Sequence, residues 1–318
     1  MRTSAIIKII TNLILVIVLI AILTSLLSGN QFGFKGFKIP IFNLGGFSYK
    51  FDDASKYSVA NGKISVDDIR KLDIDWVAGK VRIEEYSGDK IEFYEENSSS
   101  LSEDDKMRYM VDNGTLKIKF RKSYIGFGIL KSLSKELVIR IPVSMEDGLA
   151  ELKLDNVSSS IEIEALIANV VLIDSVSGNI SIKNLISKKL DIETVSGTVN
   201  VSAESEFVDA EAVSGDLNIS ISSKSIEKVD IESVSGDVSL DLGNSPKILD
   251  IETISGEVDI TLPENDGFVA KYDSVSGKFK CDFEVSITKK EAVYKDAKVN
   301  KSKLDIETVS GDITINKK

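Results

Sequence analysis

Paired carboxylates are the residues of this chain that could do chemistry, because they recur at a fixed spacing. The stretch Leu190-Asp191-Ile192-Glu193-Thr194 places two acidic residues two positions apart. On a β-strand such residues point to the same face. Sets of carboxylates could act as acid and base on a polysaccharide, or bind a divalent cation. This outward acidic ladder consists of Asp191, Glu193, Asp209, Glu211, Asp230, Glu232, Asp250, Glu252, Asp305 and Glu307.

Other catalytic groups are scarce in the sequence. The chain has no histidine and one cysteine, Cys281, which excludes Ser-His-Asp and Cys-His catalysis, His-ligated metals and an internal disulfide. We predict that Cys281 is a buried core thiol. We predict no catalytic, cofactor-binding or metal-binding residues, and no cofactor.

Calcium is the cation that the acidic ladder could bind. Stacked carboxylates repel one another, and solvent, calcium or nearby lysines could relieve the repulsion. The glycine-rich nonapeptide of calcium-binding solenoids is absent. We therefore favour a solvated face screened by Lys188, Lys189, Lys228 and Lys247.

A repeat must position the acidic pairs. Val-Ser-Gly, once Ile-Ser-Gly, recurs with its glycine at 178, 197, 215, 236, 256, 277 and 311. The glycines are 19, 18, 21, 20, 21 and 34 residues apart, and a period near 20 is typical of a solenoid. We expect an all-β parallel β-helix with right-handed coils.

Aligning the copies on the glycine predicts which side chains face the core. Apolar residues stand seven and five positions before it, and two and four after it, as in Leu190, Ile192, Val199 and Val201. A small residue stands three before it, and an apolar residue two before it breaks the alternation. We place a bend between these two. The glycine itself is explained by a positive φ or by a close backbone approach. The serine before it could bond along the stack or face solvent.

The pattern divides the chain into four parts. Two degenerate coils surround Gly79 and Ser159. We predict irregular strands between them, which would shield the open end of the solenoid. The four parts are an anchor at 1–30, a Gly- and Phe-rich linker at 31–50, a β cap with the first coil at 51–150, and a solenoid of about eight coils at 151–318. Within the cap we expect strands at 90–95, 107–111, 115–121 and 136–141.

Residues 9–27 are uncharged and long enough to cross a bilayer as a helix. A cleaved signal peptide is the alternative, although an Ala-x-Ala site is absent. We favour an uncleaved, single-pass anchor in the cytoplasmic membrane with the C-terminal domain outside. The linker that follows is expected to lie at the membrane interface or to pack on the first strands.

Two further segments stand out. A basic, aromatic loop is a candidate contact for anionic lipid or a partner protein, or else a hairpin packed on the cap. Its residues are Arg121, Lys122, Tyr124, Ile125, Phe127, Ile129, Leu130 and Lys131. The enlarged coil near 285–303 predicts a protruding hairpin or loop. The last coil would leave an edge that pairs with another chain or is covered by this insertion.

The repeats, together with Ile74-Asp75-Trp76-Val77-Ala78-Gly79 and Leu137-Val138-Ile139-Arg140-Ile141-Pro142, resemble the putative-adhesin family of bacterial β-solenoid domains, the LiaG-like envelope proteins of Gram-positive bacteria. The resemblance covers about residues 50–318. It implies an extracellular β-helix on the cytoplasmic membrane, with a link to envelope stress. It supplies no catalytic residues.

Two function classes follow from the sequence. The first is a non-enzymatic, membrane-anchored surface protein that presents a repetitive face for adhesion, to an envelope protein or a cell-wall polymer. The second is a polysaccharide-active β-helix enzyme that uses surface carboxylates. Because the acidic pairs recur in every coil and do not cluster, we favour the first. The net charge of −11 argues against nucleic acid as a partner. The sequence does not predict an oligomeric state.

Overall fold

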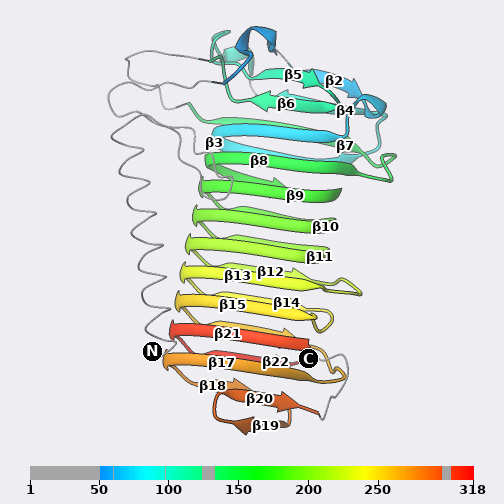
Figure 1. The fold of residues 1–318 in the computed structure, drawn as a ribbon. Coiled ribbons are helices and arrows are strands. Elements are labelled where there is room, and N and C mark those ends of the chain that lie inside the picture. The colour runs from blue at the N-terminus through cyan, green and yellow to red at the C-terminus, as the bar shows by residue number, and fades with distance from the viewer. Residues whose placement is uncertain (1–50, 60, 97, 124–132, 296–301) are drawn as a thin grey trace.

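The fold is a stack of β-coils with a cap at one end and a hairpin at the other (Figure 1). A computed structural model describes residues 51–59, 61–96, 98–123, 133–295 and 302–318. The predicted all-β solenoid is confirmed. The expected anchor and linker lie outside the described residues, and no helix within the described ranges is long and apolar enough to span a membrane.

The elements divide into three groups. The coils are formed by β3 (Lys71–Tyr86), β8 (Leu149–Ile163), β9 (Leu166–Ser177), β10 (Ile180–Ser196), β11 (Val199–Ser214), β12 (Leu217–Ile221), β13 (Lys228–Ser235), β14 (Val238–Leu242), β15 (Ile248–Ser255), β16 (Val258–Leu262), β17 (Phe268–Ser276), β18 (Phe279–Cys281), β21 (Ser302–Ser310) and β22 (Ile313–Lys317). The cap contains β1 (Ser58–Val59), β2 (Gly62–Ser65), β4 (Lys90–Glu95), β5 (Arg108–Asp112), β6 (Thr115–Lys119), β7 (Lys135–Pro142) and the 3₁₀ turns η1 (Ala54–Lys56), η2 (Val66–Asp68) and η3 (Ser98–Ser100). The hairpin is β19 (Val285–Thr288) and β20 (Glu291–Tyr294).

Parallel pairing builds the core by placing each residue beside its equivalent in the next coil. Leu190 pairs with Val171 on one side and Val208 on the other. Leu190, Ile192 and Val199 are all buried, whereas Glu193 is half-buried on the outer side. Stacking like on like turns the apolar columns into a continuous core. The predicted columns are therefore confirmed.

The turn at the corner lies later in the coil than the bend that the sequence predicts. Strand β10 continues through Ser196, and the turn comes at Gly197 and Thr198. The small residue Thr194 points inward, where it is buried, and Val195 points outward and is half-buried. The strand pairing includes Thr194 and Ser196 but leaves out Val195, so the strand is irregular next to the predicted bend, although it continues to the turn at Gly197.

Both explanations of the glycine hold at the same position. Gly197 has a φ of +120°, a region that L-residues with side chains rarely adopt. A methyl group on Gly197 would also overlap the carbonyl oxygen of Gly178 in the preceding coil. The corner therefore requires glycine for two independent reasons.

Serine hydroxyl groups donate hydrogen bonds to backbone carbonyl oxygens at the corners of the early coils. Ser177 Oγ donates to the carbonyl oxygen of Val157 at 3.2 Å, and Ser196 Oγ donates to that of Val176 at 3.4 Å. These serines bond along the stack, one of the two roles left open by the sequence.

The degenerate coils and the cap follow the sequence closely. Strand β3 pairs with β8 residue by residue, with Leu72 beside Leu152 and Gly79 beside Ser159. The outer edge of β3 is covered by β6 and β7, on which the antiparallel strands β5 and β4 are added. Four strand positions in the cap agree with prediction to within two residues. The open end of the solenoid is thus covered by paired backbone.

The order of the last two coils differs from chain order. Strand β21 pairs with β15 on one side and β17 on the other, so the last coil is inserted ahead of the coil that precedes it in sequence. The outer edge of β17 pairs with β20 of the hairpin. The insertion therefore covers the exposed edge of the stack, which is one of the two predicted alternatives. That edge belongs to β17, however, and not to the last coil in the sequence. Cys281 is half-buried and packs against the core.

A substitution pair separates the two demands on the corner glycine. Gly114 has a φ of +76°, but a methyl group there would meet no atom closer than 3.8 Å. We expect Gly114→Ala to cost about 1 kcal/mol from backbone strain. Gly197→Ala should cost about 3 kcal/mol or more, because steric overlap is added. Urea denaturation measures both, and equal losses would contradict a role for close approach.

Candidate functional site

The acidic ladder forms continuous columns on one sheet face of the stack. Asp191 pairs in register with Asp209, and Glu193 with Asp174 and Glu211. The same register continues through β13, β15 and β21, so like stands beside like. All ten predicted ladder residues are therefore brought together, at the roughly 4.8 Å spacing of neighbouring strands.

Burial and mutual repulsion make these carboxyl groups hard to ionise. Partial burial, with Asp174 and Glu211 as charged neighbours, raises the pKa of Glu193 to about 8. Burial and the adjacent Asp155 raise the pKa of Asp174 to about 7. Burial also raises the pKa of Asp209, Asp250, Glu252 and Glu307. Part of the ladder consequently holds protons near neutral pH.

Lysines compensate some of the charge from within the same strand. Lys189 Nζ lies 2.6 Å from Asp191 Oδ2, and Lys228 pairs with Asp230 in the same way. Lys247 instead pairs with Glu227 at 2.7 Å, away from the ladder. Among the described residues, no group of three or more His, Cys, Asp or Glu is arranged to hold a metal ion.

The basic loop is only partly described. Arg121 lies 2.9 Å from Asp105, and Lys122 lies 2.9 Å from Asp104, so both cations pair with the cap. The other members of the predicted contact lie outside the described residues: Tyr124, Ile125, Phe127, Ile129, Leu130 and Lys131.

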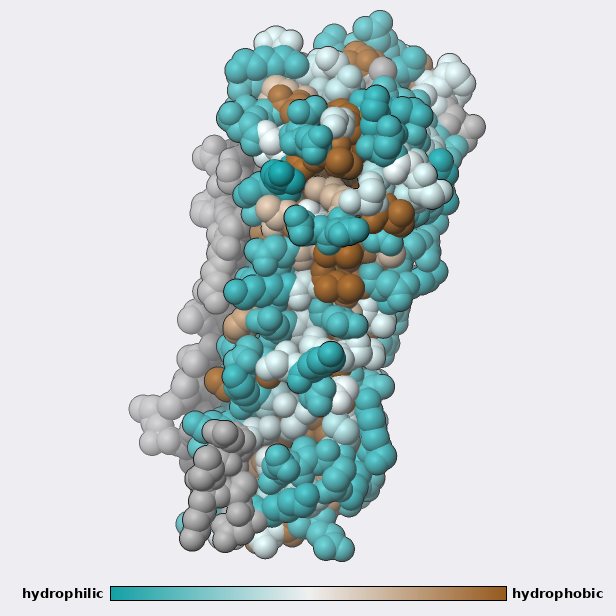
Figure 2. Space-filling model, turned by 90° about the vertical axis from the view of Figure 1, so that its right-hand side faces the viewer, coloured by the Kyte–Doolittle hydropathy of each residue, from teal (hydrophilic) through white to brown (hydrophobic). Residues whose placement is uncertain are grey.

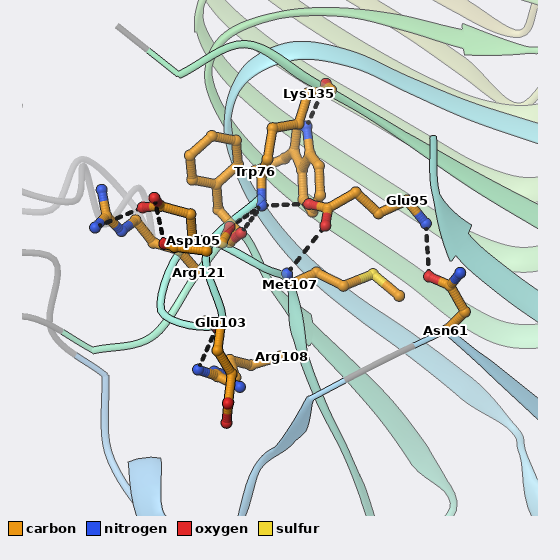
Figure 3. Close-up of polar contacts among 11 residues, drawn as sticks. Asn61, Trp76, Glu95, Glu103, Asp105, Met107, Arg108, Arg121 and Lys135 are labelled. Atoms are coloured by element: carbon orange, nitrogen blue, oxygen red, sulfur yellow. Dashed lines mark hydrogen bonds and ion pairs between the residues drawn. The ribbon is translucent and has the colours of Figure 1, made fainter. Parts of the chain in front are cut away.

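A buried ion pair in the cap was not predicted from the sequence (Figure 3). Lys135 pairs with Glu95, and their side chains are 1% and 0% exposed. The ammonium also donates to the carbonyl oxygens of Asp105 and Phe120. It lies 5.0 Å from the ring centroid of Trp76.

Burial dominates the electrostatics of this pair and lowers the pKa of Lys135 to about 8. The Lys135 side chain therefore links β7 to β4 through Glu95, and to the backbone at Asp105 and Phe120. One sequence signal could have indicated it. Trp76 stands at the column that holds small residues elsewhere, so the neighbouring layer had to differ from an ordinary coil.

The raised carboxyl pKa values predict a pH dependence of stability. Because the folded-state pKa of Glu193 lies above the usual value of 4.5, its contribution is fully present below about pH 4 and is lost as pH rises through 8. We expect Glu193→Gln to stabilise the protein at pH 9 by about 1 kcal/mol, allowing for solvent screening of a half-exposed group. Thermal melts between pH 5 and 9 test this. The exposed control Glu206→Gln should leave the pH slope unchanged, and equal slopes for Glu193→Gln and wild type would refute the assignment.

The buried ion pair predicts a large and coupled loss of stability. Lys135→Met leaves the Glu95 carboxylate buried without its cation and should cost about 3–5 kcal/mol. Adding Glu95→Gln should recover part of that loss, as a double-mutant cycle in urea would show. The matched control is Lys122→Met at the exposed pair with Asp104, which should change stability by less than about 1 kcal/mol. Additive losses at Lys135 and Glu95 would argue against coupling.

Comparison with solved structures gives distant neighbours. A crystal structure of a putative adhesin from Bacteroides fragilis NCTC 9343 is 13% identical and covers 82% of this chain and 97% of its own, with a TM-score of 0.48. A putative cell adhesion protein from Clostridium sporogenes ATCC 15579 is 16% identical, with coverages of 83% and 100% and a TM-score of 0.29. A putative lipid binding protein from Parabacteroides distasonis ATCC 8503 is 15% identical, with coverages of 83% and 97% and a TM-score of 0.36.

No curated protein matches the chain. The family model described as Toastrack DUF4097 matches residues 69–316, which include every coil from β3 to β22. This agrees with the resemblance drawn from the repeats. The chain therefore belongs to the Toastrack DUF4097 family.

Proposed function

We propose that this protein is a non-enzymatic binding module whose solenoid adheres to a protein or a cell-wall polymer outside the cytoplasmic membrane, with residues 1–30 as its anchor. The observation that carries the proposal is the repetition of outward side chains. Ladder positions carry the same chemistry in successive coils, in register from β10 to β21. A surface of that kind offers many equivalent weak contacts to a repetitive partner, which together give avidity.

The anchor and the membrane location are parts of this proposal that rest on the sequence of residues 9–27. A link to envelope stress rests on the family resemblance alone. Residues 1–30 carry Arg2 and Lys8 and no acidic residue, which favours placing the N-terminal side of residues 9–27 inside the cell.

One observation favours a second candidate, a polysaccharide-active enzyme. Burial and the neighbouring Asp155, which pairs with Lys153, raise the pKa of the Asp174 carboxyl to about 7. A protonated carboxyl beside a second carboxyl is the arrangement that general acid catalysis needs. These two residues are nevertheless members of a continuous column on a sheet face, with Asp75 and Glu193 on either side. We therefore rank the enzyme second.

Co-sedimentation with purified Gram-positive sacculi tests the proposal with the full-length chain in detergent. We expect saturable binding and no release of soluble glycan. Asp174→Asn is the diagnostic variant, because it removes the candidate general acid. Since it changes one carboxyl of a long column, its binding to sacculi should equal that of the wild type. Failure of the wild type to co-sediment would refute cell-wall binding. Glycan release that Asp174→Asn abolishes would establish the enzyme instead.

A further inference from the structure

The second sheet face of the stack carries a trough between two rows of short polar side chains. Strands β10, β11, β12 and β14 contribute one outward residue to each row. The trough has a volume of about 400 Å³, and its rows are Ser181, Asn200, Asn218 and Ser239 on one side, and Lys183, Ser202, Ser220 and Asp241 on the other. The paired register of β10 with β11, β11 with β12 and β12 with β14 holds these groups at strand spacing, except Lys183, which lies at a register shift between β10 and β11.

This trough is uncharged along its length, although the protein is acidic. Among the described residues that line it, the formal charges stand at its ends, where Lys183 Nζ lies 2.8 Å from Glu164 and Asp241 pairs with Lys318. Between them, Asn218 Nδ2 donates to Asn200 Oδ1 at 3.1 Å, which leaves the other half of each amide for a ligand. The trough therefore suits a neutral ligand rich in hydrogen-bonding groups.

A recess of about 280 Å³ adjoins the trough and shares Lys183 and Ser202 with it, and its lining mixes apolar side chains with polar and charged ones, which include Glu85 and Glu204. Its apolar lining includes Ala165, Ile167 and Ile186, and the Ile186 side chain is 50% exposed. Figure 2 shows hydrophobic residues gathered on this side of the stack.

The recess exists because two coils are short. Strands β10 and β11 cross the return side of the coil without a loop, whereas the next coils have connections at 222–227 and 243–247. These loops project beyond the ends of β9, β10 and β11 in Figure 1. The missing loop opens the apolar surface at Ile186.

We propose that the trough and recess bind a neutral glycan with N-acetylated sugars. This inference rests on the proposed function, but it assigns the binding site to the sheet face opposite the acidic ladder and names the ligand class. Ring hydroxyls and the acetamide N–H and C=O match hydroxyl and amide side chains, which donate and accept. The acetyl methyl matches the exposed apolar side chain of Ile186 within the recess. Both volumes are in or near the range of small-ligand sites, which combine apolar lining with a few placed polar groups. A polyanion would be repelled by the net charge of −11.

Isothermal titration of the full chain with two tetrasaccharides tests the inference. The probes are β-1,4-linked N-acetylglucosamine tetramer and the β-1,4-linked glucose tetramer, which lacks the acetamide. We expect the acetylated probe to bind at least 10-fold more tightly. Ser202→Tyr blocks the junction of trough and recess and should weaken binding at least 10-fold. Its matched control is Ser286→Tyr, at another exposed strand serine on β19, which should bind as the wild type does.

A second variant tests the recess separately. Ile186→Ser should reduce the preference for the acetylated probe and leave affinity for the glucose tetramer unchanged. Because Ser202 and Ile186 are exposed side chains, neither substitution should prevent folding. The melting temperatures of Ser202→Tyr and Ile186→Ser verify this. No binding of either probe, or binding that Ser202→Tyr leaves intact, would overturn the inference. Equal binding of the two probes would do the same.

The sacculus experiment distinguishes this failure from failure of the proposed function. If the wild type and Ser202→Tyr both co-sediment equally with sacculi, the binding function stands and this site is wrong. If the wild type fails to co-sediment and binds neither probe, both are wrong.

Discussion

Parallel, in-register pairing of successive coils is the constraint on which the rest of the structure depends. It puts each side chain beside its equivalent at strand spacing, as in the run from Ile173 through Ile192 to Ala210. Inside, this pairing turns modest apolar residues into a continuous core. At the corners, it brings the Gly197 backbone against that of Gly178, and only glycine fits. Outside, it forces carboxylates of the same column together, whatever the cost in repulsion.

The two sheet faces respond to that constraint in different ways. On the ladder face, repulsion is relieved by proton uptake at residues such as Glu193 and by lysines such as Lys189. On the opposite face, between β10 and β14, the outward columns are serines and asparagines with Lys183 and Asp241 at the ends of one of them, so stacking creates hydrogen-bonding rows whose middle carries no charge. One backbone plan thus yields a charged surface and a neutral one, and a partner of either chemistry would meet several equivalent groups.

Both ends of a solenoid need pairing that the repeat does not supply. At the first end, β6 and β7 cover β3, and the buried pair of Lys135 with Glu95 locks that layer together. At the other, β20 pairs antiparallel with β17 and covers its edge. Both ends use aromatic residues, and the cap adds buried charge, where the inner coils use aliphatic residues. Changing the cap should therefore affect stability without altering the ladder or the trough.

The sequence by itself determined the coil, because an inward column is visible wherever residues such as Leu190, Ile192 and Val199 recur in phase. It also determined the ladder, since outward position follows from the same phase. Tertiary structure decided what depends on contacts between distant segments. The sequence could not show that β21 inserts between β15 and β17, because its Leu304–Thr308 segment matches several coils equally well. Trp76 in the small-residue column marks the cap layer as irregular, but neither the Lys135–Glu95 pair itself nor the recess at Ile186 could be predicted. These arise where loops and cap strands break the period, and a periodic pattern carries no information about its own interruptions.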